Sequence, residues 1–270
     1  MSELTFETLM DEALAAPMTG WSFRFLRGRS TAAPLPWNYG AVAAGLAGDR
    51  PLLDLGTGGG EVLAGLPARP ARTVATENWA PNVLVAARRL HPLGIPVVHY
   101  QAAPANLAQD AGPGPADLPD RLPFRDGAFG LVLSRHEAFR ASEVARVLGP
   151  GGHFVTQQVD LHDDDDYRAA LGLAAGPAAG QPAAESWLPA ARQQVRAAGL
   201  TELRAERVVQ QISYADVGAL AWYLVRAVPW LVPEAGLPAV RPALRRLHDQ
   251  MREAPLTVRA HRFLLVARKP

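Results

Sequence analysis

The sequence of 270 residues contains no cysteine. Disulfide bonds, thiolate zinc ligands and thiol catalysis are therefore excluded. Long hydrophobic runs are also lacking, and none approaches the roughly 20 residues that a membrane-spanning helix needs. The N-terminal segment has neither the basic start nor the apolar middle of a signal peptide. These absences predict a soluble, cytoplasmic protein.

A strong charge of one sign is a further absence. The 27 basic and 26 acidic residues leave a formal net charge of +1. This balance gives no support for a generic binder of nucleic acids or anionic membranes. Hydrophobic residues make up 49% of the chain, which is enough for a large core at this length. The chain therefore suits one α/β domain with an inserted or appended subdomain.

The most informative feature present is the segment 52–66, LLDLGTGGGEVLAGL. An apolar run ends at Asp54, glycines follow at alternate positions, and a helical pattern begins directly after them. A strand, a glycine turn and a helix start in this order allow a ligand to approach the backbone closely. A dinucleotide site would carry another glycine three positions after Gly58, and that position is Glu61. The pattern therefore argues against a pyrophosphate over this helix.

Three further motifs follow the glycine turn. The full set is the turn from Asp54 to Gly60, the run ending in Glu77, the segment 122–133 that begins Leu-Pro-Phe, and the segment 143–152 that ends Pro-Gly-Gly. Over about residues 37–160, their order and spacing resemble class I S-adenosylmethionine-dependent methyltransferases of the type 11 group, which includes ubiquinone-biosynthesis-like enzymes. The resemblance implies an α/β fold with a doubly wound, Rossmann-like sheet of seven strands. It also implies S-adenosylmethionine as cofactor and S-adenosylhomocysteine as product.

The resemblance further indicates which residues contact the cofactor. In this family a carboxylate at the end of the second strand holds the ribose hydroxyls, and Glu77 occupies that place. Asn78 has a second interpretation, as the cap of a helix before Pro81. The expected cofactor-binding residues are Asp54, Gly56, Thr57, Gly58, Gly60, Glu77, Asn78, Gln101, Ala102, Ser134 and Arg135.

Methyl transfer from a sulfonium is an in-line displacement whose leaving group needs no proton. Alignment and exclusion of water are therefore the main demands on the protein. His136 follows the fourth strand at the ligand-binding edge of the sheet and is the candidate catalytic residue. An imidazole can take a proton from an acceptor hydroxyl or amine. The alternative is a histidine that caps a helix or bonds the lid.

The remaining segments are assigned around this core. Residues 1–40 are expected to form an N-terminal helix, from Glu3 to Ala16, and a lid over the cofactor. Residues 41–212 form the expected cofactor-binding core, 213–256 a helical insertion that shapes the acceptor pocket, and 257–270 the final strand. The substrate-lining candidates are aromatic residues of the lid and the insertion: Trp21, Trp37, Tyr39, Trp222, Tyr223 and Trp230. The lid aromatics have a second interpretation, in which they pack the N-terminal helix onto the sheet.

His162 and the four aspartates that follow it could suggest a metal site. Four consecutive carboxylates cannot all point at one ion, and negative charge favours the N-terminus of the helix predicted from Tyr167. No metal is therefore expected.

The sequence thus predicts an enzyme that methylates an oxygen or nitrogen of a small-molecule acceptor, without membrane or nucleic-acid partners. Two alternatives stay open. An RNA base methyltransferase would suit the arginine-rich lid. A non-catalytic cofactor-binding protein would suit Gly130, which stands where the family usually has aspartate.

Overall fold

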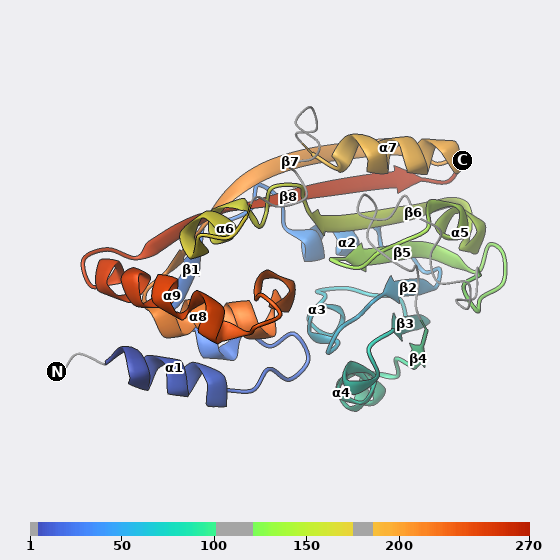
Figure 1. The fold of residues 1–270 in the computed structure, drawn as a ribbon. Helices are drawn as coiled ribbons and strands as arrows, with labels where there is room; N and C mark the ends of the chain where they lie inside the picture. Colours follow the sequence, from blue (N-terminus) through green and yellow to red (C-terminus); the bar gives the residue numbers. More distant parts are fainter. Residues whose placement is uncertain (1–4, 101–120, 175–185) are drawn as a thin grey trace.

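The sheet of this protein extends through the whole molecule (Figure 1). The computed structural model describes residues 5–100, 121–174 and 186–270. In this part of the chain the sheet has eight strands in the order β1-β7-β8-β6-β5-β2-β3-β4. Their bounds are β1 (Ser30–Ala32), β2 (Leu52–Leu55), β3 (Thr73–Glu77), β4 (Val97–His99), β5 (Phe129–Arg135), β6 (Leu148–Val159), β7 (Thr201–Tyr214) and β8 (Leu256–Arg268).

Strands β4, β3, β2, β5 and β6 run parallel to one another. In contrast, β8 is antiparallel to both β6 and β7, and β1 is antiparallel to β7. The predicted doubly wound α/β class is confirmed. Because the central strands are parallel, their carboxyl ends meet at one edge, where open α/β sheets bind ligands.

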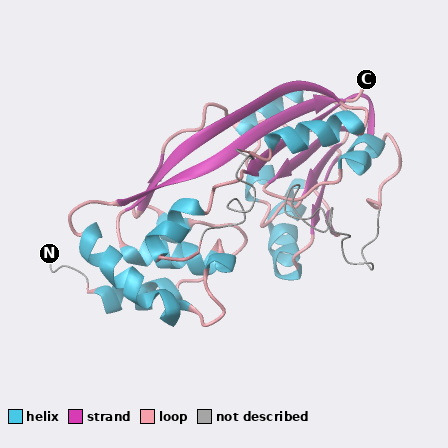
Figure 2. Ribbon diagram, turned by 45° about the horizontal axis from the view of Figure 1, so that its top comes forward, coloured by secondary structure: helices cyan, strands magenta, loops and turns pink. Residues whose placement is uncertain are grey.

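Helices cover both faces of the parallel strands (Figure 2). The α-helices are α1 (Phe6–Ala15), α2 (Tyr39–Leu46), α3 (Glu61–Ala64), α4 (Ala80–Leu90), α5 (Ala141–Val147), α6 (Asp165–Leu171), α7 (Leu188–Ala197), α8 (Val217–Arg226) and α9 (Leu237–Met251), and the 3-10 helices are η1 (Arg24–Leu26), η2 (His91–Leu93) and η4 (Pro229–Leu231). One face packs against α5 and α7, and the other against α2, α3 and α4. Leu52 and Leu53 of β2 are fully buried between them, which explains the continuous apolar sequence of this strand.

A third hydrophobic cluster joins α1, α6, α8 and α9, which we call the helical layer. The long strands β7 and β8 reach this layer from the sheet (Figures 1 and 2). Trp222 of α8 is fully buried there, and its indole N–H donates to the carbonyl oxygen of Ala16 at 3.1 Å. The N-terminal segment and the helices between β7 and β8 therefore share one core.

Two details differ from the sequence-based expectation. The eighth strand, β1, was not predicted; it lies in the expected lid and pairs with the end of β7, Ser30 opposite Tyr214. The first helix begins at Phe6, because the Thr5 side chain accepts a hydrogen bond from the Thr8 backbone N–H and caps the helix. Within the described residues, no helix has the length and apolar character that crossing a membrane would require.

Candidate functional site

The glycine turn after β2 has the backbone conformation that its sequence predicts. Gly56, Gly58 and Gly60 have φ angles of +61°, +62° and +78°, a region that L-residues with a side chain rarely adopt. A Cβ on Gly56 would overlap the Glu137 side chain, and one on Gly58 would overlap the Trp21 ring. The turn therefore needs glycine both for its conformation and for the close approach of other groups.

Glu77 holds this turn in place. One carboxylate oxygen accepts a hydrogen bond from the Gly58 N–H at 2.6 Å, and the other accepts one from the Trp79 N–H at 2.9 Å. The side chain is buried, and burial raises its pKa.

Asn78 lies outside the cap position of α4, because that helix begins at Ala80 with Trp79 as its N-cap. The helix-cap interpretation of Asn78 is therefore wrong.

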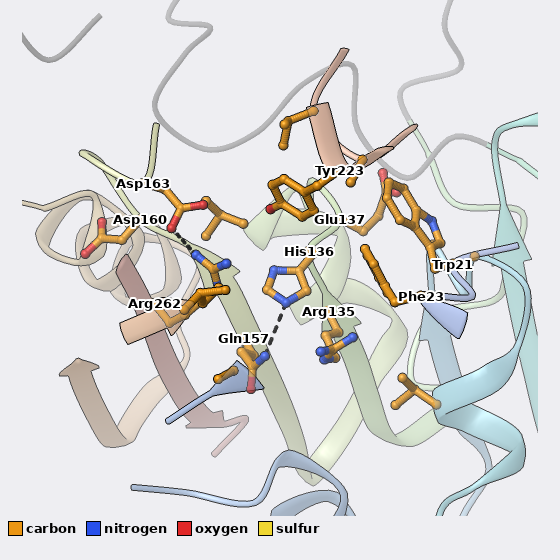
Figure 3. Close-up of a pocket in the computed structure, with 18 of the residues that line it drawn as sticks. Trp21, Phe23, Arg135, His136, Glu137, Gln157, Asp160, Asp163, Tyr223 and Arg262 are labelled. Atoms are coloured by element: carbon orange, nitrogen blue, oxygen red, sulfur yellow. Dashed lines mark hydrogen bonds and ion pairs between the residues drawn. The ribbon is translucent and has the colours of Figure 1, made fainter. Parts of the chain in front are cut away.

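A cavity of about 1290 Å³ extends from the glycine turn to the helical layer. Most of the predicted site residues line it: Asp54, Gly56, Thr57, Gly58, Glu77, Asn78, Arg135, His136, Trp21, Tyr223 and Trp230. Figure 3 shows His136 and Arg135 in this cavity, between Trp21 and Phe23 on one side and Arg262 on the other. The strand ends and the two aromatic segments thus meet around one space.

Other predicted residues lie elsewhere. Gly60 packs against Leu90, and Ser134 is fully buried with its hydroxyl donating to the Glu137 carbonyl oxygen at 2.8 Å. Trp222 belongs to the core of the helical layer, which differs from the expected substrate contact. Trp37 and Tyr39 are buried against the sheet and border a smaller neighbouring pocket. Gln101 and Ala102 lie outside the described residues.

Two acids of the cavity have strongly raised pKa values. Burial raises the pKa of Asp54 to about 7. Burial, followed by the charge of Glu77, raises the pKa of Glu137 to about 7. Sequence reasoning missed Glu137, although its position directly after His136 at the ligand-binding edge was a usable signal. These carboxylates surround the glycine turn and suit a cationic ligand.

His136 has an unusual backbone and a defined partner. Its φ is +58°, and its N–H donates to the Gln157 carbonyl oxygen at 2.9 Å. Its Nε2 lies 3.2 Å from the Gln157 side-chain nitrogen. Loss of solvation inside the cavity, followed by the charges of Arg135 and Arg262, lowers its pKa well below the usual histidine range. The imidazole is therefore neutral at neutral pH.

The aspartate run after His162 has separate partners. Asp163 pairs with Arg262, Asp165 with His162, and Asp166 with Arg259. Asp164 accepts a hydrogen bond from the Trp230 indole N–H at 2.9 Å. The run therefore ties the start of α6 to β8 and to the wall of the cavity.

Gly130 has a packing explanation. A Cβ at this position would overlap the Cβ of Arg50, and the Arg50 guanidinium donates to the Pro150 carbonyl oxygen at 2.7 Å. The glycine makes room for an arginine that precedes β2 and bonds to Pro150 in β6. This explanation removes the feature that suggested a non-catalytic protein.

Comparison with known proteins agrees with this geometry. Residues 53–156 match a family model described as a methyltransferase domain. This part of the chain is therefore a methyltransferase domain. Enzymes of this family take S-adenosylmethionine as cofactor, and this methyltransferase does the same. No curated protein matches the chain.

Solved structures share the fold of this methyltransferase. A protein of unknown function from Deinococcus radiodurans has 17% identity and a TM-score of 0.51, with 92% of this chain and 97% of that chain covered. BH2331 from Bacillus halodurans, provisionally assigned as a methyltransferase, has 17% identity and a TM-score of 0.52, with 86% and 97% covered. YcgJ from Bacillus subtilis has 16% identity and a TM-score of 0.51, with the same coverage.

Proposed function

We propose that this methyltransferase transfers the methyl group of S-adenosylmethionine to an oxygen or nitrogen atom of a small molecule bound in the cavity. The observation that carries the proposal is the extent of the cavity. Its volume of about 1290 Å³ exceeds the roughly 300–1000 Å³ typical of a site for one drug-sized ligand. Cofactor and acceptor can therefore occupy it together.

The residues around the glycine turn fit the cofactor. The Glu77 carboxylate suits the ribose hydroxyls, and Asp54 and Glu137 suit the cationic sulfonium and ammonium groups. The glycines leave room for close contact, and in this structure Trp21 and Glu137 rest against Gly58 and Gly56. The cofactor supplies the methyl group and a neutral leaving group when it is bound.

The other half of the cavity is proposed as the acceptor site. Tyr223 and Trp230 come from α8 and η4, which lie in the chain between β7 and β8, and Phe23 comes from the N-terminal segment. Phe23 and Tyr223 lie against each other, with ring centroids 6.4 Å apart. These aromatic walls give a planar acceptor an apolar surface. His136 lies at the border between the two halves.

The arginine-rich lid gives little support for RNA as the acceptor. Arg29 is held by Asp216 through two hydrogen bonds of 2.6 and 2.8 Å and lies over the Phe25 ring. Of the lid arginines, Arg27 lines the cavity. An RNA substrate would show salt-sensitive binding, which a filter-binding titration at 50 and 200 mM salt measures.

Cofactor binding is tested by calorimetry. S-adenosylhomocysteine and S-adenosylmethionine should bind the wild-type protein, and NAD should not. Glu77→Gln replaces one charged oxygen by an amide nitrogen that cannot accept a hydrogen bond. The binding free energy of S-adenosylhomocysteine should therefore weaken by about 1.5–3 kcal/mol. Glu253→Gln, at an exposed position, is the matched control. Wild-type affinity in a folded Glu77→Gln protein would remove Glu77 from the site.

Turnover is tested by release of S-adenosylhomocysteine in the presence of small phenols, carboxylic acids and amines. If His136 contacts the reacting acceptor, His136→Ala should lower turnover and leave cofactor affinity nearly unchanged. His91→Ala, at an exposed position, should have normal turnover. A His136→Ala protein with near-normal turnover would reduce His136 to a wall of the cavity.

A further inference from the structure

The end of β5 turns two consecutive polar side chains into the same cavity. Neighbouring residues of an extended strand point to opposite faces, yet Arg135 and His136 both line the cavity. The positive φ of His136, +58°, breaks the alternation. Such a conformation in a residue with a side chain costs of order 1–3 kcal/mol and is concentrated at functional sites. This backbone conformation places the His136 imidazole beside the Arg135 guanidinium.

A chain of hydrogen bonds fixes which nitrogen of His136 carries the proton. The Trp37 indole N–H can only donate, and it donates to the Gln157 side-chain oxygen at 2.9 Å. The Gln157 amide nitrogen therefore faces Nε2 of His136, at 3.2 Å, and donates to it. Nε2 is the acceptor, so the proton of the neutral imidazole is on Nδ1. His136 thus offers a hydrogen-bond donor to the cavity through Nδ1.

Arg135 adds a second donor at the same place. Its side chain is exposed to the cavity, and no hydrogen bond or ion pair joins its guanidinium to any described residue. The neighbouring Arg262 differs, because Asp163 neutralises it. Asp54 attracts the Arg135 guanidinium without a hydrogen bond, so its donors are available to a planar anion, which a guanidinium can bind with two parallel hydrogen bonds.

We propose that the methyl acceptor carries a carboxylate, and that Arg135 together with the Nδ1–H of His136 binds this carboxylate. The inference rests on the proposed function, whose acceptor site it specifies. Phe23 and Tyr223 line the same cavity beside these donors, so an aromatic carboxylic acid fits the space. In this arrangement Arg135 and His136 orient the acceptor for attack on the methyl group.

The carboxylate of the cofactor is the competing occupant of Arg135. Two features place Arg135 away from Glu77. Glu77 of β3 and Arg135 of β5 end on opposite sides of β2 in the sheet. Arg135 also borders Gln157 of β6, the strand on the side away from Glu77. Arg135 is thus separated by β2 from Glu77, the proposed ribose ligand, whereas Glu137 at the glycine turn lies on its own side, and a direct measurement distinguishes the two occupants.

The test is a binding titration of the protein saturated with S-adenosylhomocysteine. The probes are benzoate, cinnamate and 2-naphthoate, each paired with its uncharged primary amide. At least one acid should bind about 10- to 100-fold more tightly than its amide, which is the range for hydrogen bonds to charged groups. Arg135→Gln should abolish this preference, and Arg88→Gln, an exposed arginine on α4, should keep it. Acids that bind no better than their amides would overturn the proposal.

A second measurement separates the two occupants. Arg135→Gln should leave the affinity for S-adenosylhomocysteine unchanged. If that affinity falls while the affinity for 5′-methylthioadenosine, which lacks the amino-acid part, stays constant, Arg135 holds the cofactor carboxylate and the proposal is wrong. Failure of S-adenosylhomocysteine to bind the wild-type protein would instead refute the proposed function.

A third measurement concerns the tautomer. Nitrogen-15 spectra of histidine-labelled protein should show His136 protonated on Nδ1, with the signal assigned by its loss in His136→Asn. Trp37→Phe removes the donor that orients Gln157, so a mixture of tautomers is expected in that variant. Protonation on Nε2 in the wild-type protein would contradict the proposed donor role.

Discussion

The contact between Trp21 and the glycine turn can be measured by a double-mutant cycle. Gly58→Ala imposes a left-handed conformation on a residue with a Cβ, which costs about 1–2 kcal/mol. The new Cβ would also overlap Trp21 and lie 3.1 Å from its Nε1, so the ring must move. Movement weakens its stacking on Phe23, an interaction with an expected value of about 0.5–1.5 kcal/mol. The sum predicts a loss of about 1.5–3.5 kcal/mol in the free energy of unfolding.

In a Trp21→Ala background, the overlap is absent and only the backbone cost of about 1–2 kcal/mol stays. The predicted coupling energy is therefore about 0.5–1.5 kcal/mol, measured by urea unfolding of the four proteins. Gly28→Ala is the matched control, because Gly28 has a φ of +73° and none of the described atoms lies within 4 Å of the place that its Cβ would take. Additivity of the Gly58 and Trp21 effects within about 0.3 kcal/mol would show that Trp21 does not rest on the turn.

Three further results are expected. Asp54 and Glu137, with pKa values of about 7, bind more protons in the folded than in the unfolded protein, so the free energy of unfolding should fall as pH rises towards 7. Their ionised forms attract the sulfonium of S-adenosylmethionine, so the ratio of its affinity to that of S-adenosylhomocysteine should rise from about pH 6 to 8. A ratio that stays constant in calorimetry would contradict this. Hydrogen exchange across residues 20–40 should slow when the cofactor binds, and equal exchange in both states would refute a lid. Trp222→Ala should lower the free energy of unfolding by about 3–5 kcal/mol because the side chain is fully buried, and a smaller loss accompanied by weaker acceptor binding would return Trp222 to the acceptor site.

The sequence predicts that the glycine turn, Asp54 and Glu77 lie together, and the reason is local. The glycine turn, Asp54 and Glu77 lie within or next to short strand ends, so spacing along the chain determines where they meet. Parallel pairing of β2 with β3 and β5 then brings them to one edge. The sheet order and the position of His136 follow from the same rule.

The acceptor half depends on contacts between distant segments. Trp222 has the same aromatic character as Tyr223 beside it, yet one residue fills the core of the helical layer and the other lines the cavity. Which of the two residues faces the core depends on the orientation of α8 about its axis relative to α1, and the local sequence pattern does not determine that orientation. The bond from Trp37 to Gln157 likewise joins residues 120 positions apart. It determines the proton position on His136, a property that the histidine's own neighbours along the chain do not indicate.

The end of β5 carries two arrangements that are unfavourable in the free protein. One is the left-handed backbone of His136, and the other is the unpartnered guanidinium of Arg135 among the described residues. The bonds from Gln157 to both the backbone and the ring of His136 maintain the first arrangement whether or not a ligand is present. A bound carboxylate would relieve only the second, because it supplies the missing acceptor for the guanidinium. Binding free energy is therefore concentrated at Arg135, while His136 is already oriented before the acceptor arrives. On this reasoning Arg135→Gln should raise KM for the acceptor, and loosening His136 through Trp37→Phe should act mainly on kcat.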